Sequence, residues 1–410
     1  MPVTLDSIRA ARDRINDVIH PSPCNYSLSL SRLCNAEIHC KLDHLQVTGS
    51  FKERGARNKL KLLQSSLNPE PQTLNPLSVI AASAGNHAQA LAYHGQSLGI
   101  PVTVVMPRWA PLVKVSNCRS FGATVLLHGE SYEDAKHEAC RLAKEESLTY
   151  IPGFDDEDII AGQGTLGLEI LEDVPDADAI VVPVGGGGLI AGIATAVKAL
   201  KPSVKIVGVE PINAPTLHES LKRNQVTRIA TKPTLADGLA ISEVGHLCFD
   251  LLKSRLDELL LVDEPTIARS VLKLLELEKT MVEGAGAVPL AAAMNPACNL
   301  TGKKVVLVLA GGNIDVTLLS RIIDRGLAAD GRLCRVTACV GDRPGSLARL
   351  TAILASTGAS VLDIAHDRHF GPADPALVTI TATCETRDAA HIAELESALK
   401  SANIEFSREE

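Results

Sequence analysis

Short apolar runs alternate with helical patterns along the middle of the chain. The runs are rich in Val, Ile and Leu, which is typical of strands buried on both faces of a sheet. They are Leu77–Ala82, Val102–Met106, Ala123–Leu127, Ala179–Val184, Val204–Val209 and Lys304–Leu309. The helical segments between them are Ala88–Leu98, Tyr132–Glu146, Ile159–Leu171 and Leu189–Leu200. This alternation predicts an α/β protein with parallel sheets covered by helices, in which ligands bind at the loops that follow the strands.

The C-terminal segment has a different order of elements. The pattern predicts a strand, a helix, two strands, a helix and a last strand, at Arg335–Val340, Ser346–Thr357, Ser360–His366, Ala376–Cys384, Arg387–Lys400 and within Ile404–Ser407. This βαββαβ order indicates a small ferredoxin-like unit after a linker at Asp330-Gly331. The segment carries no obvious catalytic residue, so we expect it to serve in binding or assembly.

Composition narrows the classes of function. The 410 residues are 46% hydrophobic and 21% charged, as in a compact folded protein. A net charge of −8 and 3% aromatic residues disfavour a nucleic-acid partner. The ten cysteines form no C-x-x-C pair or zinc spacing, which favours buried thiols in a reducing compartment. The uncharged stretch Ala179–Val197 contains Pro183 and four glycines, and the N-terminus lacks an apolar signal sequence, so we expect a cytoplasmic protein without a membrane segment.

The first candidate for chemistry is Lys52, which lies between glycines just before a helical pattern over Ala56–Gln64. A solvated surface lysine is the simpler interpretation of this segment alone. A chemically active lysine needs a lowered pKa, because only the neutral amine attacks a carbonyl. A helix N-terminus and the nearby Arg54 would both disfavour the ammonium form.

A second candidate is Ser83-Ala84-Gly85-Asn86-His87, which follows an apolar strand and opens a helix. Backbone N–H groups at such a start can bind a carboxylate or a phosphate. A plain turn capped by Ser83 or Asn86 is equally consistent with the pattern. His87 is more typical of a packed or capping histidine than of a base.

The run Gly185-Gly186-Gly187-Gly188 also lies between a strand and a helix. Without Cβ atoms the main chain can approach an anion closely, and the helix dipole favours negative charge. No Lys-Ser/Thr follows, which argues against a nucleoside triphosphate. A dinucleotide, with Glu210 as the acidic partner, stays open on this loop alone, although a compact phosphate fits better.

A fourth segment, Ala310-Gly311-Gly312-Asn313, closes the last core strand. It is either a tight turn or a place where the backbone approaches a flat ligand. A reactive lysine, a carboxylate-binding turn, a phosphate-binding glycine run and this strand end together describe a site for pyridoxal 5′-phosphate and an amino acid.

Six motifs in order resemble those of the threonine dehydratase and serine racemase family, which has fold type II. They are Ser50-Phe51-Lys52-Glu-Arg-Gly55, Ser83-Ala-Gly-Asn86-His87, Ala161-Gly-Gln-Gly164-Thr165, Gly185–Gly188, Thr234-Leu-Ala-Asp237-Gly238 and Gly311-Gly-Asn313. The resemblance implies two doubly wound parallel-sheet lobes within residues 1–328, the small lobe covering about 50–150. Residues 333–410 resemble an ACT domain, with Asp342-Arg-Pro-Gly345 at the turn where such domains often bind amino acids.

The resemblance also implies roles for the residues. Lys52 would carry the cofactor covalently and remove the Cα proton, with Phe51 beneath the ring and Asn86 on its hydroxyl. The four glycines would hold the phosphate, and Ser83 to His87 would hold the substrate carboxylate. The implied reaction is β-elimination of L-threonine to 2-oxobutanoate and ammonia, or of L-serine to pyruvate. A homo-oligomer and an amino-acid effector of the ACT-like unit are implied as well.

Three positions depart from the family. Ala310 stands where a hydroxyl or thiol usually faces the ring nitrogen, and Ala84 stands where racemases carry a serine. Both changes favour elimination over racemisation. Ala214-Pro-Thr216 breaks the divalent-metal pattern near Glu210, so we expect no metal. A serine dehydratase/racemase, a 3-hydroxyaspartate ammonia-lyase and an inactive amino-acid sensor remain alternatives, although the intact Lys52 argues against a sensor.

Overall fold

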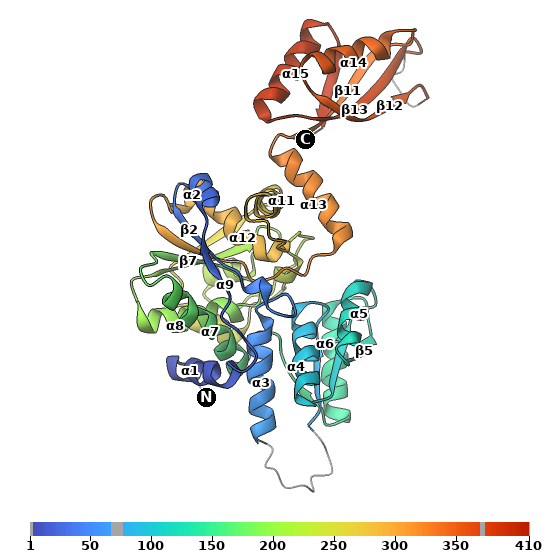
Figure 1. Cartoon of the computed structure of the whole chain (residues 1–410). Helices are drawn as coiled ribbons and strands as arrows, with labels where there is room; N and C mark the ends of the chain where they lie inside the picture. Colours follow the sequence, from blue (N-terminus) through green and yellow to red (C-terminus); the bar gives the residue numbers. More distant parts are fainter. Residues whose placement is uncertain (1–2, 67–76, 370–373, 410) are drawn as a thin grey trace. The chain divides into compact units, whose positions relative to one another are not determined.

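The computed structural model describes residues 3–66, 77–369 and 374–409. The chain forms two compact units, Met1–Asp315 and Val316–Glu410. The helix α13 (Val316–Ala329), most of which the sequence analysis assigned to the first domain, belongs to the second unit (Figure 1). In the part of the chain that the structure describes, no helix is both long and apolar enough to cross a membrane.

The large lobe of the first unit is built on a six-stranded sheet of order β1-β2-β10-β7-β8-β9. All neighbouring strands are parallel except β1 and β2. The strands are β1 (Cys24–Tyr26), β2 (Glu37–Lys41), β7 (Ala179–Pro183), β8 (Lys205–Pro211), β9 (Glu258–Val262) and β10 (Lys304–Val308). The predicted strands near 179, 204 and 304 are confirmed, whereas β1, β2 and β9 were not predicted.

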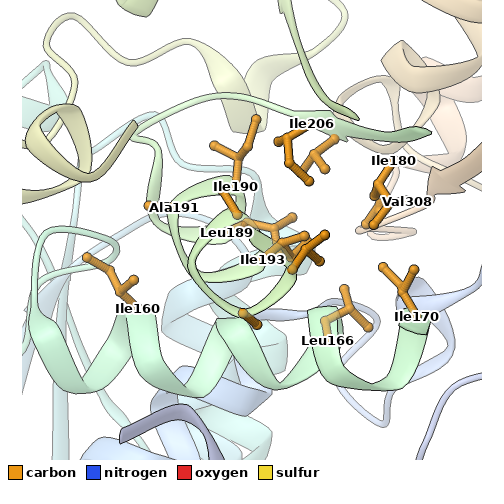
Figure 2. Close-up of a cluster of buried hydrophobic side chains, with 14 of the residues drawn as sticks. Ile160, Leu166, Ile170, Ile180, Leu189, Ile190, Ala191, Ile193, Ile206 and Val308 are labelled. Carbon is orange, nitrogen blue, oxygen red and sulfur yellow. The ribbon is translucent and has the colours of Figure 1, made fainter. Parts of the chain in front are cut away.

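Helices pack against this sheet and bury its apolar residues. They are α1 (Leu5–Ile15), α2 (Leu28–Cys34), α7 (Glu157–Asp173), α8 (Gly188–Leu200), α9 (Thr216–Arg223), α10 (His246–Leu252), α11 (Glu264–Lys273) and α12 (Gly284–Ala293), with short turns at Asp43–Leu45, Asp237–Leu239, Leu274–Glu278 and Pro296–Cys298. Figure 2 shows the main core cluster, in which Leu166 and Ile170 of α7 and Ile193 of α8 gather near Ile180 and Val308 of the sheet. Because α7 and α8 are buried along most of their length, they fix the loops at their ends.

The small lobe is a parallel four-stranded sheet of order β5-β4-β3-β6. Its elements are α3 (Lys52–Ser66), β3 (Val79–Ala82), α4 (Asn86–Leu98), β4 (Val102–Met106), α5 (Leu112–Ser120), β5 (Thr124–Leu127), α6 (Tyr132–Glu145) and β6 (Thr149–Tyr150). The prediction that Ala123–Leu127 is buried on both faces is wrong. As the edge strand of the sheet, β5 leaves Thr124, Leu126 and Leu127 exposed to solvent.

Glycines bring the two lobes into close contact at α3 and α7. An ideal Cβ on Gly162 of α7 would lie 2.6 Å from Gly55 Cα and 2.7 Å from the carbonyl oxygen of Arg54, both in α3. The backbones of these helices therefore touch directly, which only residues without a side chain allow. Helix α3 begins at Lys52, four residues before the predicted helical pattern, so this contact sets the position of Lys52.

The second unit has the predicted βαββαβ order. Its antiparallel sheet has the order β12-β13-β11-β14, and the elements after α13 are β11 (Leu333–Gly341), α14 (Ser346–Ser356), β12 (Ser360–Asp367), β13 (Leu377–Glu385), α15 (Ala389–Ser401) and β14 (Glu405–Glu409). Strands β11 and β13 alternate buried and partly exposed residues, so one face packs on the two helices.

Candidate active site

A cavity of about 500 Å³ lies where strands of both lobes end. Its wall contains the residues to which the resemblance gave a role toward the cofactor or the substrate carboxylate: Phe51, Lys52, Ser83, Ala84, Gly85, Asn86, His87, Gly185, Gly186, Gly187, Gly188 and Ala310. These segments follow β3, β7 and β10 or open the next helix, as expected for the carboxyl edge of parallel sheets. The structure thus brings together residues that are more than 250 positions apart in the chain.

Three of the helices that begin at this cavity start with residues that the sequence analysis selected. Helix α3 starts at Lys52, α4 at Asn86 and α8 at Gly188, and the N-termini of α4 and α8 have no side-chain cap. The first N–H groups of a helix lack partners within it and carry partial positive charge. The cavity wall therefore offers two separate places for anionic groups, one at Gly185–Gly188 and one at Ser83–His87.

The neighbouring helix α10 differs because its N-terminus is already occupied. The Asp155 carboxylate accepts hydrogen bonds from the backbone N–H groups of His246 (3.0 Å) and Leu247 (3.0 Å). Asp155 therefore holds this helix beside the glycine run. The starts of α4 and α8, in contrast, have no side-chain cap.

Lys52 is held against the large lobe. Its Nζ donates a hydrogen bond to the Gly153 carbonyl oxygen at 2.6 Å and lies 5.1 Å from the centre of the Phe51 ring. Burial lowers the pKa of Lys52 to about 8, because enclosure by protein disfavours the ammonium form. Arg54, which we expected to contribute, is balanced by Asp43 and Glu169 in a buried cluster. A lowered lysine pKa is confirmed, but burial is its main cause.

His87 is buried beside the same cavity. Burial, and next the charge of Lys52, lower the pKa of His87 to about 3, so its imidazole is neutral at physiological pH. Its Nε2 lies 3.3 Å from the Ile151 carbonyl oxygen, and within the described residues its Nδ1 has no hydrogen-bond partner. A neutral, packed ring agrees with the interpretation that His87 is not a charged base.

The glycine run Gly185–Gly188 packs directly against Phe154. Besides leaving its N–H groups accessible to an anion, the lack of side chains therefore allows this close packing. A Cβ on Gly186 would overlap the Phe154 ring, and one on Gly188 would lie 2.9 Å from the Phe154 carbonyl oxygen. Gly187 has a φ of 94°, which L-residues with side chains rarely adopt. The loop can take this path between the cavity and Phe154 only as glycine.

Glu283 is a site residue that the sequence analysis missed. It lies just before α12 and lines the cavity, and its carboxylate accepts a hydrogen bond from Asn86 Nδ2 at 2.8 Å. Burial, followed by the negative charge of Asp237, raises the pKa of Glu283 to about 7. A Cβ on Gly311 would overlap this carboxylate. Gly311 therefore leaves space for the Glu283 carboxylate, which could not be inferred from the residues next to it in the sequence.

Glu210 is occupied elsewhere. Its two carboxylate oxygens accept hydrogen bonds from the backbone N–H groups of Leu217 (2.7 Å) and His218 (2.9 Å) in α9, and burial raises its pKa to about 8. It is absent from the cavity wall, so the structure does not support the dinucleotide interpretation that used it. Among the described residues, no group of three His, Cys, Asp or Glu side chains is arranged to hold a metal ion.

Comparison with known families agrees with this geometry. Residues 15–311 match the family described as "Pyridoxal-phosphate dependent enzyme". This chain belongs to that family. The family depends on pyridoxal phosphate, and the match covers both lobes and the whole cavity wall. Residues 335–402 match the ACT domain, in agreement with the resemblance of the C-terminal segment.

Relatives of this pyridoxal-phosphate dependent enzyme extend over nearly its whole length. An L-threonine ammonia-lyase of Thermotoga maritima is 44% identical over 397 residues, which are 97% of each chain. One of Geobacter sulfurreducens is 40% identical over 400 residues, covering 98% of this chain and 97% of that protein. Among solved structures, threonine deaminase isoform 2 of Solanum lycopersicum has a TM-score of 0.73 at 34% identity, covering 79% of this chain and 90% of that one. Maize serine racemase has a TM-score of 0.73 at 32% identity, covering 80% and 99%.

The cavity wall fits pyridoxal 5′-phosphate. It offers a lysine amine of lowered pKa, an uncapped helix start lined by glycines, and a partly apolar lining that includes Phe51 and Ala310. The amine is suited to the aldehyde and the helix start to the phosphate. The helix start at Asn86 is also uncapped and suits a further anionic group.

Proposed function

We propose that this enzyme is an L-threonine ammonia-lyase that also accepts L-serine. Support comes from the two near-full-length relatives of that name, which match both the catalytic unit and the ACT domain. The observation that carries the proposal is the cavity wall, where Lys52 lies together with two uncapped helix N-termini. This arrangement can hold the phosphate of the cofactor and the carboxylate of an amino acid at separate places.

The residues of the chain have distinct roles in this proposal. The N–H groups at Gly185–Gly188 bind the phosphate, and those at Ser83–His87 orient the substrate carboxylate. Lys52 would hold the cofactor through its Nζ, and its free amine would take the Cα proton of the bound substrate. When bound, pyridoxal 5′-phosphate supplies a conjugated ring that stabilises the charge left on Cα. Phe51 and Ala310 shield this region from water.

The atoms balance as follows for L-threonine. The Cα proton passes to Lys52, and the Cβ hydroxyl takes up one proton and departs as water. The proton on Lys52 makes good the one taken up by the hydroxyl, so the net loss from the substrate is one water. The resulting 2-amino-2-butenoic acid rearranges to its imine, and water then replaces nitrogen, which leaves as ammonia. The products are 2-oxobutanoate and ammonia, with no net use of water and no oxidant.

The charges in the wall favour a substrate with one carboxylate. Besides Lys52, the only lysine or arginine among the described wall residues is Lys114, whose Nζ lies 3.1 Å from Asp237. Glu133 and Glu283 add further carboxyl groups. A second carboxylate, as in 3-hydroxyaspartate, would meet these groups without an unpaired cation. Ala84 lines the cavity and offers no hydroxyl for proton exchange at Cα, which disfavours the racemase alternative.

The ACT domain suggests a regulatory or assembly role for the second unit. Its helix α14 begins after Gly345, which has a φ of 92°, and carries no side-chain cap. An uncapped start of this kind suits the carboxylate of an amino-acid effector. Binding of such an effector, and assembly into a homo-oligomer in the cytoplasm, remain part of this proposal.

The test is a panel of amino acids with the purified holoenzyme. Release of 2-oxo acid is measured with L-threonine, L-serine and 3-hydroxyaspartate, together with chiral analysis of the remaining serine. Lys52→Ala should abolish both 2-oxo acid release and the visible absorbance of the bound cofactor. Lys61→Ala is a matched control on the same helix, because Lys61 pairs with Asp17 on the surface, away from the cavity. Turnover by Lys52→Ala, or oxo-acid release from 3-hydroxyaspartate alone, would refute the proposal.

A further inference from the structure

Glu283 is fixed by its backbone on one side of the cavity. Its N–H donates to the Gly311 carbonyl oxygen at 3.0 Å, and its own carbonyl oxygen accepts from Gly286 (2.9 Å) and Ala287 (3.0 Å). It occupies the N-cap position of α12, yet its side chain makes no capping hydrogen bond to that helix. The carboxylate instead points to the small lobe, where it meets Asn86. The Glu283 carboxylate therefore forms its side-chain hydrogen bond with the small lobe and not with the helix that it precedes.

The amide of Asn86 has a single orientation in this network. Asn313 Nδ2 donates one hydrogen to the Thr48 carbonyl oxygen (2.6 Å) and the other to Asn86 Oδ1 (2.8 Å). Asn86 Nδ2 therefore faces Glu283, which accepts one of its two hydrogens at 2.8 Å. Within the described residues the second N–H has no further acceptor, and Asn86 lines the cavity. The assignment of oxygen and nitrogen follows from both neighbours independently.

The strand end is shaped to admit this contact. A Cβ on Gly311 would overlap the Glu283 carboxylate and would lie 3.2 Å from Asn86 Nδ2. Gly238 also lies beside Glu283, with its ideal Cβ position 3.7 Å from the carboxylate oxygen. That distance is an ordinary contact, so Gly311 alone must lack a side chain to leave space for the buried carboxyl group, which joins the large lobe to the first residue of α4.

We propose that Glu283 is a positioning residue that acts through Asn86. By accepting one amide hydrogen, it holds the other toward the ring oxygen of the cofactor; this inference rests on the proposed function. Glu283 contacts neither the glycine run nor Lys52 in the hydrogen bonds of the described residues, so its effect should be confined to the ring and to the small-lobe helix that Asn86 begins. Both partners line the cavity and are held by the backbone of their own lobe, so loss of this hydrogen bond would leave a buried amide hydrogen of Asn86 without its acceptor.

The test is a double-mutant cycle read by spectrum and cofactor affinity. Glu283→Ala should weaken pyridoxal 5′-phosphate binding to the apoprotein about ten- to hundredfold, because the Asn86 amide loses its buried acceptor. It should also shift the visible band of the bound cofactor and lower kcat more than it raises KM. Asn86→Ala should do the same, and Glu283→Ala should add little in that background. Glu283→Gln keeps an acceptor oxygen and should fall between wild type and Glu283→Ala.

The control is Glu210→Gln, which alters another buried carboxyl group. Glu210 accepts two backbone hydrogen bonds and does not line the cavity. It should leave the cofactor spectrum unchanged. Equal losses from Glu283→Ala in the wild-type and Asn86→Ala backgrounds would overturn the positioning role, as would an unchanged spectrum in Glu283→Gln and Glu283→Ala. Absence of the spectrum or of turnover in the wild type would instead refute the proposed function.

Discussion

The close contact between α3 and α7 allows a test of whether helix packing positions Lys52, with a substitution outside the cavity wall. Gly162→Ala introduces a methyl group whose ideal position is 2.6 Å from Gly55 Cα and 2.7 Å from the Arg54 carbonyl oxygen. Both obstacles are backbone atoms, so no side chain can rotate away. Ordinary carbon contacts begin near 3.5 Å. The helices must therefore separate by about 1 Å, and α3 carries Lys52 at its first position.

Two opposing terms set the size of the effect. Alanine in place of glycine gains about 1 kcal/mol within a helix. Overpacking of a well-packed contact costs about 1–3 kcal/mol. The net change in the free energy of unfolding is a loss of up to about 2 kcal/mol. The effect on turnover is larger, since a 1 Å displacement of a catalytic group can cost about a hundredfold.

The assay compares Gly162→Ala with Gly167→Ala. Gly167 lies on the same helix but faces α8, and its ideal Cβ is 3.1 Å from the nearest atoms of Ile193. Only a small adjustment is needed there, so we expect Gly167→Ala to keep most of the stability and activity. Thermal unfolding and kcat are measured on both holoenzymes. If Gly162→Ala were as active and as stable as the wild type, the argument that this contact positions Lys52 would be wrong.

Three further predictions follow from the buried charges and the cavity wall. Capture of pyridoxal 5′-phosphate by the apoprotein should accelerate about tenfold per pH unit up to the Lys52 pKa of about 8 and then level off, because only the neutral amine reacts; a rapid-mixing absorbance profile that is flat below pH 8 would contradict this. Arg54→Met should lower the free energy of unfolding by about 3–5 kcal/mol, because Asp43 and Glu169 lose their buried partner; denaturant unfolding that shows a loss below about 1 kcal/mol would argue against it. Ala84→Ser should raise serine racemisation in a chiral assay, and the interpretation of Ala84 fails if the wild type already racemises serine as fast as it eliminates water.

Strong local patterns predicted much of the fold. Strands such as Val102–Met106 coincide with the structure because they are continuous apolar runs buried on both faces. Strand β2 escaped prediction because Glu37–Lys41 carries two charged residues and a histidine. Lys41 is fully buried there only because Glu169 and Asp173 lie 2.9 and 2.8 Å from its Nζ. Those partners are more than 120 positions away, and no local pattern reports them.

The site was predicted where the residue type itself reveals the chemistry. A lysine between glycines and a run of four glycines are visible in the sequence, and all of them reach the cavity wall. Glu283 was missed because a lone glutamate before a helix is typical of a surface capping residue. Gly55 and Gly162 were noted only as parts of motifs, although they serve helix packing. Distinguishing such uses requires the distances between segments.

The order of strands in the larger sheet has a consequence for how the protein is synthesised. The strands β3 to β6 are contiguous in the chain, so the small lobe can fold as soon as residue 150 has left the ribosome. Strand β2, in contrast, pairs on its inner edge with β10, which begins only at Lys304. Until then its backbone groups on that side lack their partner, and nascent chains expose an unpaired strand edge prone to aggregation. The catalytic unit is therefore completed last at its centre, and fragments that stop before β10 should lack a formed cavity.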